Sequence, residues 1–446
     1  MNVRDLIPEG NLVRLLAAAA ILHLLLVVSI YLAGRWGLWP TTFDANGIGL
    51  PFASDCLGYR LEAVSLTEVL TRQGLMAWLT SSSAYLINPL HVKIYSLSFL
   101  ALGPLLGYNI LAAEPLNLIY YLTILYLVVL LGREVFDEGT GLLAARAVAL
   151  WPSLLLHTTQ LFRDPLFIAG VVGLALVCVR SVTRDYSLVK GLRAAACGSL
   201  LTVLLWLLRR EMWEVVMAIL LVTAGLLVIK QLRDRRVLAG SLLTVSLLLV
   251  ANLSIPRVWG ALERRQTQNS ASQPAAPQVL RHSPPGSGLQ VRIMQLRHGF
   301  TTAYPNATSN IDTDVEFRSL SDIVLYLPRA ASIGFFAPFP NMWFTPGAEA
   351  GLKGRLLTGF ETLLMYVVTL LAALSLWYNR GKLSVWLLFL AAGAGLVALG
   401  FTVTNVAALY RMRYSYWILL IVLGAEGFRR VFGYVKQNTG VRTQNR

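Results

Sequence analysis

The sequence carries little charge for its length. Asp, Glu, Lys and Arg make up 14% of the 446 residues, whereas they make up about a quarter of a typical soluble domain. Hydrophobic residues make up 56%, and the mean hydropathy is +0.61. These proportions exclude an ordinary soluble protein and predict an all-α polytopic membrane protein.

Cysteine is also scarce, and several catalytic motifs are missing. Cys56, Cys178 and Cys197 lie far apart in the chain, so their spacing indicates no disulfide framework. Glycine-rich phosphate loops, zinc-binding patterns and nucleophile elbows do not occur. Soluble nucleotide chemistry is therefore not expected.

Acidic residues are outnumbered by basic ones. The chain has 38 Lys and Arg against 23 Asp and Glu, a formal net charge of +15. Such a balance can reflect nucleic-acid binding, anionic lipid or membrane topology. The basic residues gather between apolar runs, which favours topology, so membrane lipids and not nucleic acid are the expected partners.

Apolar runs long enough to cross a hydrocarbon core of about 30 Å occur about ten times. Every second connection between them is rich in Lys and Arg, which predicts a cytoplasmic position for these connections and for the C-terminus. The other connections, 35–114, 159–164, 209–212, 255–355 and 405–413, are then external. The predicted spans are 12–34, 115–133, 140–158, 165–182, 192–208, 213–230, 237–254, 357–378, 383–403 and 414–428.

The spans divide the chain into three parts. Residues 1–255 are predicted to form a transmembrane core that includes a first external loop at 35–114. Residues 256–355 form a large external region, in which the Ser-, Pro-, Gln- and Ala-rich stretch 266–288 has the composition of a mobile segment. Residues 356–446 form the last spans and a basic cytoplasmic tail.

Two amphipathic or apolar stretches in the external loops predict helices on the membrane surface. Leucine, valine and tryptophan alternate with charged residues over 61–79, the pattern of a surface helix. The apolar run 92–106 contains Lys93, and an extra span there would invert every later loop, so it is interpreted as interfacial or re-entrant. The aromatic stretch 323–344 is predicted to fold back onto the membrane face.

Arginines stand at the external ends of several predicted spans, where the positive-inside rule disfavours them. A guanidinium is planar, permanently charged and suited to phosphate. Several such ends, together with Asp55 from the first external loop, could enclose one anionic site; snorkelling to headgroups or local pairing is the alternative. The residues are Arg163, Arg209, Arg210, Arg411 and Arg413, accompanied by Asp164 and Glu211.

Asp55 lies between an irregular stretch and the predicted surface helix. A loop carboxylate there could act over the outer membrane face, although Asp is also a common helix N-cap. His91, His157, His282 and His298 have no metal-ligand spacing and are interpreted as interface or loop residues.

A series of short motifs, in this order, resembles the GT-C superfamily of polytopic glycosyltransferases, which use lipid-phosphate-linked sugars. The members most similar in pattern are the dolichyl- or undecaprenyl-phosphate-mannose-dependent mannosyltransferases. The basic-aromatic tail Tyr410-Arg411-Met-Arg413-Tyr414 also fits the pattern. The motifs are Ser54-Asp55-Cys-Leu-Gly-Tyr59, Asn88-Pro-Leu-His-Val-Lys-Ile-Tyr95, Leu106-Gly-Tyr-Asn109, Leu130-Leu-Gly-Arg133, Gly141-Leu-Leu-Ala-Ala145, Trp151-Pro-Ser153 and Arg163-Asp-Pro-Leu166.

The resemblance implies roles for two carboxylates. The loop Asp of the family is its usual catalytic group and corresponds to Asp55, and an acid at the external end of the third span corresponds to Asp164. Asp55 lacks a following Glu, and Arg163 replaces a second acid before Asp164. These departures leave a divalent cofactor, Mg²⁺ or Mn²⁺, an open question, with Asp164 and Glu211 expected to orient either the acceptor or such an ion.

The function predicted from these residues is inverting sugar transfer at the external face of a bacterial-type inner membrane. The donor is a polyprenyl-phosphate sugar, and the acceptor is a glycan, lipid or protein. Asp55 is the expected general base, the five arginines bind the lipid phosphate, and Tyr59, His91 and His298 are further candidates.

Two other functions remain as alternatives. An oligosaccharide polymerase or ligase would act on polyprenyl-diphosphate-linked glycans, with the arginines and His298 most important. A non-catalytic transporter of lipid-linked substrates ranks third, because its polar residues belong near mid-membrane, whereas the charges here lie at helix ends.

Overall fold

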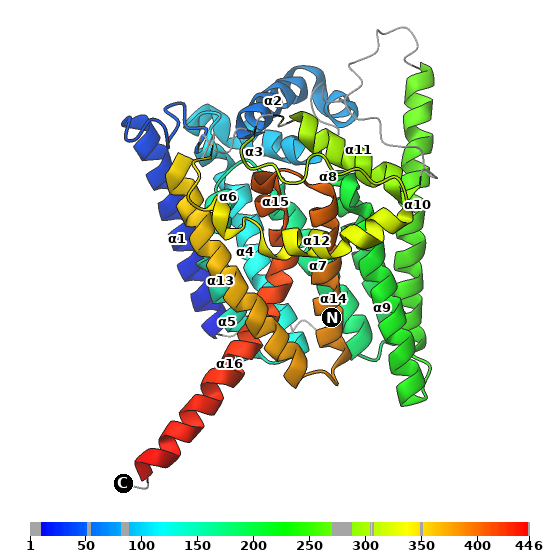
Figure 1. Ribbon diagram of the computed structural model, residues 1–446. Coiled ribbons are helices and arrows are strands. Elements are labelled where there is room, and N and C mark those ends of the chain that lie inside the picture. Colours follow the sequence, from blue (N-terminus) through cyan, green and yellow to red (C-terminus); the bar gives the residue numbers. More distant parts are fainter. Residues whose placement is uncertain are drawn as a thin grey trace.

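The chain folds into a helical bundle, which a computed structural model describes for residues 10–50, 55–81, 89–269, 288–303, 305, 307–347 and 351–444 (Figure 1). These residues form sixteen α-helices, short 3-10 turns and two isolated β-bridges. The predicted all-α fold is confirmed. The helices are α1 (Gly10–Arg35), α2 (Asp55–Thr80), α3 (Leu90–Leu106), α4 (Ile110–Val135), α5 (Glu138–Ala149), α6 (Pro152–Thr158), α7 (Asp164–Thr183), α8 (Leu188–Leu208), η2 (Arg210–Met212), α9 (Trp213–Asp234), α10 (Ala239–Asn269), α11 (Leu289–Ala303), α12 (Leu320–Phe336), η3 (Pro340–Met342), α13 (Gly351–Tyr378), α14 (Leu383–Thr402), α15 (Val406–Met412) and α16 (Tyr414–Gln444).

Eight of the described helices are long and apolar enough to cross a membrane, and two bent pairs bring the number to ten. Each coincides with a predicted span. The helices α5 and α6 meet at an angle of 71°, and α15 and α16 meet at 56°. Pro152 opens α6, where its missing N–H would break a continuous helix but suits a first turn. The two short helices of these pairs, α6 and α15, lie close to the candidate site described below.

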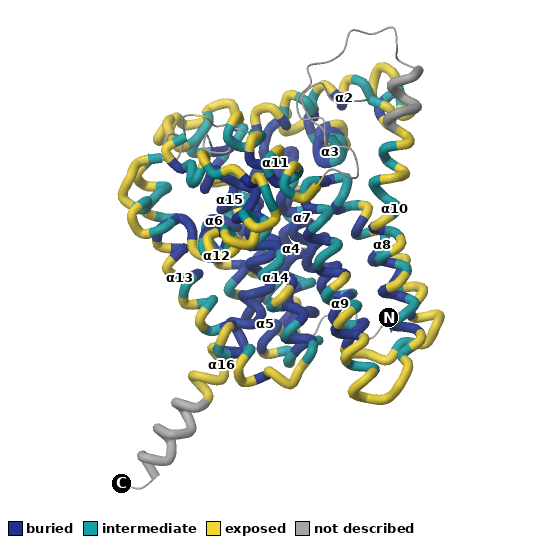
Figure 2. The backbone as a smooth tube through the Cα atoms, turned by 45° about the vertical axis from the view of Figure 1, so that its right-hand side comes forward, coloured by how far each residue is buried: buried dark blue, intermediate teal, exposed yellow. Residues whose placement is uncertain are grey.

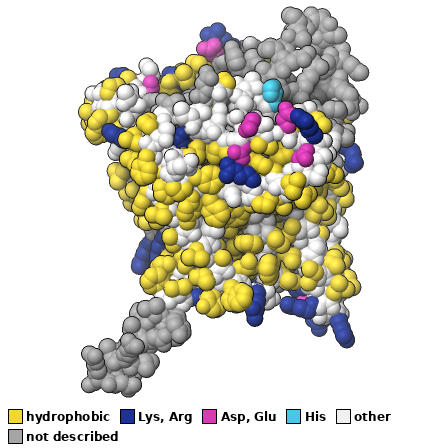
Figure 3. Space-filling view, in the orientation of Figure 1, with side chains coloured by type: hydrophobic (Ala, Val, Ile, Leu, Met, Phe, Trp, Pro, Cys, Tyr) yellow, Lys and Arg dark blue, Asp and Glu magenta, His cyan; other side chains and the backbone are white. Residues whose placement is uncertain are grey.

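The described surface has the layered character of an integral membrane protein. Figure 3 shows a broad band of hydrophobic side chains, with Lys and Arg at its lower end. The connections predicted to be cytoplasmic meet at this end: Lys230 Nζ lies 3.3 Å from Asp185 Oδ1, and Arg233 Nη1 donates to the Gly381 carbonyl at 3.4 Å. We call this the basic end of the bundle. The helices α2, α3 and α11 lie at the opposite end, called here the α2 end (Figure 1).

The buried core follows the helices at the centre of the bundle. Figure 2 shows α4, α5, α7 and α14 as largely buried. In α7, 78% of the residues in the most apolar part of the helix are buried inside the protein. This helix starts at Asp164, so a carboxylate lies at the mouth of the most enclosed of the eight unbroken spans.

The loop 35–114, predicted to be external, forms the two helices that the sequence predicts there. The helix α2 begins at Asp55, earlier than the amphipathic pattern indicated, and bends at Gly74, whose φ is 86°. It packs against α3, where Trp78 Nε1 donates to Ser96 Oγ at 2.9 Å. With 17 residues, α3 is shorter than the spanning helices, and its interfacial or re-entrant position stays a prediction.

Residues 256–355, predicted to be external, are more helical than their composition predicted. The helix α10 continues to Asn269, across the proposed domain boundary at residue 255, and residues 270–287 of the expected mobile stretch lie outside the described residues. The helix α12 lies against α14, because Gly334 and Gly400 have no side chains to hold the two backbones apart. A Cβ on Gly400 would lie 1.9 Å from the Ala330 carbonyl oxygen.

Candidate functional site

At the α2 end, one arginine contacts two carboxylates from distant parts of the chain. Arg411 Nη2 donates to Asp55 Oδ2 at 2.7 Å, and Arg411 Nε lies 3.3 Å from Asp164 Oδ2. The Arg411 side chain is 19% exposed and the Asp55 side chain 28% exposed, so the pair faces the exterior of the protein. Within the described residues, Asp55 Oδ1 and Arg411 Nη1 have no partner.

Asp164 is held more deeply than Asp55. Its side chain is only 7% exposed, and Arg209 Nη2 donates to its Oδ1 atom. Arg209 is itself buried and stacks over the Phe167 ring at 5.6 Å. Because Arg209 and Arg411 take both oxygens of Asp164, this carboxylate fixes the two guanidiniums and is closed to solvent.

Arg163 and Glu211 complete the charge group. Glu211 Oε1 accepts from Arg209 Nη1 at 3.4 Å and lies 3.6 Å from Arg163 Nη2. Arg163 Nη1 also donates to the Leu208 carbonyl at 3.2 Å. The acid that lies nearest to the Arg163 guanidinium is thus Glu211 and not the neighbouring Asp164. Three arginines and three carboxylates balance in charge: Arg163, Arg209 and Arg411 with Asp55, Asp164 and Glu211.

The first turn of α2 is docked onto the connection between α6 and α7. Cys56 is fully buried and bonds to the Leu161 backbone, and burial raises the pKa of its thiol, which makes it unreactive. Tyr59 follows Asp55 by one helical turn, packs edge-on against His91 at 4.5 Å, and has a pKa raised by burial. Asp55 thus lies, partly exposed, in the first turn of α2 beside the buried Cys56, and does not precede the helix as an N-cap would.

The loop before α2 is fixed to the same connection. Gly49 has a φ of 116°, a left-handed value that favours glycine, and a Cβ there would lie 2.1 Å from Gln160 Oε1. That oxygen accepts from the Leu50 backbone N–H at 3.2 Å. The close approach of Gly49 to Gln160 thus helps to set where α2 begins.

Arg411 is positioned from the other side by the turn between α14 and α15. Asn405 caps α15 by accepting from the Ala408 N–H at 3.0 Å. The neighbouring backbone pairs with the external region, because Ile311 N–H donates to the Thr404 carbonyl at 2.9 Å and Val406 N–H to the Ser309 carbonyl at 3.0 Å. Arg411 then projects over the Phe162 ring at 4.4 Å.

Three candidate residues lie outside this group. Arg210 stacks over the Trp259 ring at 5.3 Å. Arg413 is completely buried, donates to the Ala337 carbonyl and stacks over Tyr410 at 4.4 Å. His298 is exposed on α11, where its Nε2 lies 3.4 Å from Thr302 Oγ1. The contacts of Arg210, Arg413 and His298 are thus with groups other than Asp55 and Asp164.

Two buried acids near the site were missed in the sequence. Glu361 is fully buried in α13 and accepts from the Ser153 backbone N–H at 2.6 Å and from the Tyr410 hydroxyl. Glu114 lies 2.8 Å from His23 Nδ1, between α4 and α1. Both could have been found in the sequence, because each is a lone acid within or next to a predicted span. A carboxylate in the hydrocarbon region is costly and therefore needs a partner inside the protein.

The carboxylates do not form a metal-binding group. Among the described residues, no cluster of three or more His, Cys, Asp and Glu side chains could hold a metal ion. Mg²⁺ and ions of similar preference require several oxygen ligands in fixed geometry, whereas Asp55 and Asp164 both bond to Arg411. The side chains around Arg411 therefore do not fit a Mg²⁺ or Mn²⁺ ion.

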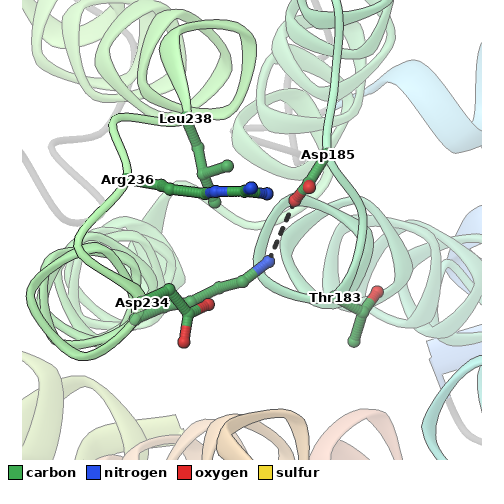
Figure 4. A pocket seen from close by; sticks show the side chains of 6 residues that line it. Thr183, Asp185, Asp234, Arg236 and Leu238 are labelled. Carbon is green, nitrogen blue, oxygen red and sulfur yellow. Dashed lines mark hydrogen bonds and ion pairs between the residues drawn. The ribbon is translucent and has the colours of Figure 1, made fainter.

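An open pocket of about 590 Å³ lies away from this group, at the basic end (Figure 4). It is formed by the α7–α8 and α9–α10 connections, and the ion pair between Lys230 and Asp185 crosses it. Its two bases, Lys230 and Arg236, are balanced by Asp185 and Asp234. This balance gives the pocket no charge with which to select an ion.

Comparison with known proteins adds evidence about the fold. No protein-family model and no curated protein matches the chain. The archaeal oligosaccharyltransferase AglB from Archaeoglobus fulgidus, solved in complex with an inhibitory peptide and a dolichol-phosphate, matches with a TM-score of 0.50 and 15% identity over 97% of this chain. The apo form of the oligosaccharyltransferase from the same organism matches with a TM-score of 0.48 and 13% identity over 97% of this chain. The chain spans 52% of the length of each. The chain therefore shares the helical membrane fold of this oligosaccharyltransferase over nearly its whole length.

Proposed function

We propose that the protein is a membrane glycosyltransferase that moves a sugar from a polyprenyl-phosphate donor to a hydroxyl or amide acceptor on a glycan, lipid or protein. The observation that carries the proposal is the contact of Arg411 with Asp55 at the α2 end. It joins a partly exposed carboxylate, which can accept a proton, to a permanent cation, which can bind a phosphate.

Asp55 is the general base of the proposed reaction. Its Oδ2 atom is held by Arg411, which leaves Oδ1 for the acceptor. Oδ1 takes the proton as the acceptor atom forms a bond to the anomeric carbon of the sugar. The bond between that carbon and the phosphate oxygen breaks in the same step, so the configuration at the anomeric carbon inverts.

The arginines stabilise the leaving lipid phosphate. Arg411 keeps Nη1 free of partners among the described residues, beside Nη2, which donates to Asp55, and Nε, which lies within ion-pair distance of Asp164. Arg163, 23% exposed, is the next arginine that a phosphate at this end would reach. Donors fixed in advance stabilise charge that develops in the transition state, because they need no reorganisation. Arg209 supports them from the buried side through Asp164.

The proposed donor and acceptor fit the solved structure of similar fold. That oligosaccharyltransferase was solved with a dolichol-phosphate and a peptide, which supports a lipid phosphate as leaving group and includes proteins among the acceptors. The Lys and Arg residues of the basic end support a cytoplasmic position for it. The proposed reaction then takes place at the periplasmic face of a bacterial inner membrane, with the C-terminus in the cytoplasm.

The experiment uses the purified chain in nanodiscs with a radiolabelled polyprenyl-phosphate sugar and envelope lipids and glycans as acceptors. Asp55→Asn is expected to lower the transfer rate at least about 100-fold, as loss of a general base does. Glu68→Gln, an exposed acid on the same helix, is the control. Equal rates for the wild type and Asp55→Asn, at matched protein levels, would remove Asp55 from the mechanism.

A second function is favoured by one observation, the fold shared with an oligosaccharyltransferase. In this alternative the donor carries a diphosphate-linked oligosaccharide, and the same arginines bind a larger leaving group. Gel analysis of the product separates the two. Addition of a single sugar supports the monosaccharide transferase, whereas a ladder or transfer of a complete glycan supports the polymerase or ligase.

A further inference from the structure

The Asp55–Arg411–Asp164 contacts raise the question of which cation serves this site. Two carboxylates that face one another at the edge of a membrane repel unless a cation lies between them. In many enzymes a divalent metal ion supplies this charge. Here Arg411 lies between the two acids, with Nη2 2.7 Å from Asp55 Oδ2 and Nε 3.3 Å from Asp164 Oδ2.

The geometry points to the Arg411 guanidinium as the built-in cation of this carboxylate pair, so that the proposed transfer proceeds without a divalent metal ion. Only the sugar-transfer reaction in this inference rests on the proposed function. The position of the Arg411 guanidinium between Asp55 and Asp164 does not depend on it.

The neighbouring charges support this assignment. A divalent ion that replaced Arg411 would lie next to Arg209, whose Nη2 bonds to the same Asp164 carboxylate, and would be repelled by it. The third acid, Glu211, is already shared by Arg163 and Arg209. Each carboxylate of the group therefore has an arginine partner, and none is left to complete an oxygen coordination shell.

The contacts that hold Arg411 in place also support its assignment as the cation of this carboxylate pair. The guanidinium stacks over Phe162 at 4.4 Å, which favours a cation at that position. The helix that carries it, α15, is capped by Asn405, and the turn before that helix is bonded to the backbone of residues 309–311. A charge fixed in this way needs no binding step, unlike a metal ion taken from solution.

The first measurement is divalent-ion binding to the full-length wild-type protein in nanodiscs, followed by the Mn²⁺ electron paramagnetic resonance signal. We expect no stoichiometric binding up to about 1 mM Mn²⁺ and less than a twofold change in the transfer rate with EDTA. One bound Mn²⁺ per chain that disappears in Asp164→Asn, or a rate that falls at least tenfold with EDTA and returns with Mg²⁺, would overturn the inference.

The second measurement replaces the guanidinium chemically. Arg411→Ala is expected to lower the unfolding temperature, and 50 mM guanidinium chloride is expected to raise it again by occupying the vacated position. Arg318→Ala, which removes an exposed arginine whose partner is Glu316, is the matched control and should show no such rise. An equal response of the two variants to guanidinium contradicts the inference.

Both binding readouts are independent of catalysis. If the protein transfers no sugar but binds no Mn²⁺ and shows guanidinium rescue in Arg411→Ala, the proposed function fails and the assignment of Arg411 stands. If transfer occurs and depends on a bound metal ion, the proposed function stands and the assignment of Arg411 fails.

Discussion

Arg411 Nη2 donates to Asp55 Oδ2 at 2.7 Å across 356 positions of sequence. The contact joins the start of α2, in the loop after the first span, to α15, which precedes the last span. Between them Asp164, at the mouth of α7, ion-pairs with the same guanidinium. The site is thus assembled from three helix ends, and each of its charges depends on the others for its position.

Arg411→Lys tests whether the shape of the guanidinium matters beyond its charge. A lysine ammonium is a compact point charge and cannot present two separate edges to Asp55 and Asp164. We expect the transfer rate to fall about 10- to 100-fold with little change in the amount of folded protein, measured by initial rates and size-exclusion chromatography. A wild-type rate in Arg411→Lys would show that positive charge alone is sufficient.

Asp164→Asn tests the buried part of the group. It takes one of two carboxylate partners from Arg209, which is only 3% exposed, and leaves Glu211 at 3.4 Å as the other. Breaking a buried ion pair from one side costs about 3–5 kcal/mol, so we expect a lower unfolding temperature together with a large loss of transfer.

The double variant Asp164→Leu/Arg209→Met separates the two effects. Replacing both partners of a buried ion pair by apolar residues is often close to neutral for stability. We expect the unfolding temperature to recover toward the wild type while transfer stays low, because Arg411 has lost one of its two carboxylates. Recovery of both quantities would assign Asp164 a purely structural role.

The membrane spans could be predicted because the features that make a segment span a membrane lie within that segment and its flanks. About twenty apolar residues and a basic flank are both visible in one window of sequence, and all ten predicted ranges coincide with helices or bent pairs. The bend between α5 and α6 was not predicted, because the apolar run 140–158 continues across Leu150–Trp151 and only packing against neighbouring helices fixes the angle there. The break before α16 coincides with the predicted start of the last span at residue 414, but the short helix α15 before it was not predicted.

The site was predictable in part for a related reason. Charges at the ends of apolar runs are conspicuous, so Asp55, Asp164, Glu211 and the five arginines could be named. Their pairing depends on how the helices are arranged, which no local pattern encodes. Arg411 and Arg413 are two positions apart, yet one bonds to Asp55 and the other is buried against the Ala337 carbonyl.

Gly49→Ala tests how the loop before α2 sets the position of Asp55. The φ of 116° is unfavourable for alanine, and its Cβ would meet Gln160 Oε1. We expect a protein that still folds, because the change is confined to a loop, but transfers sugar about tenfold more slowly. Circular dichroism checks that Gly49→Ala folds, and initial rates measure its loss of transfer.

Gln160→Ala removes the atom that the new methyl group would meet, and provides the internal control. In the double variant Gly49→Ala/Gln160→Ala the steric conflict is gone, whereas the backbone strain remains. A partial return of the rate is the expected result. If the double variant is slower than Gly49→Ala alone, the hydrogen bond from Leu50 to Gln160 matters more than the close approach.

A pH-dependent contribution to stability is expected from Asp312, in the segment that holds the turn before α15. Arg329 donates two hydrogen bonds to its carboxylate, at 2.9 and 3.1 Å, and these bonds lower the pKa of Asp312. A carboxyl whose folded pKa lies below its unfolded value, about 3.9, stabilises the protein fully above that value. The contribution is lost as the pH falls through the folded pKa.

Asp312→Asn isolates this charge, because asparagine also tolerates the left-handed backbone found there, with a φ of 51°. Arg329 is 46% exposed, so solvent screening limits the contribution to about 1 kcal/mol or less. We expect the variant to unfold at a slightly lower temperature than the wild type at pH 7, in a non-ionic detergent, and the difference to shrink below about pH 4. Glu316→Gln, an exposed acid of the same segment, should leave the unfolding temperature unchanged at both pH values. A difference for Asp312→Asn that persists at pH 3 would mean that the hydrogen bonds, and not the charge, stabilise this segment.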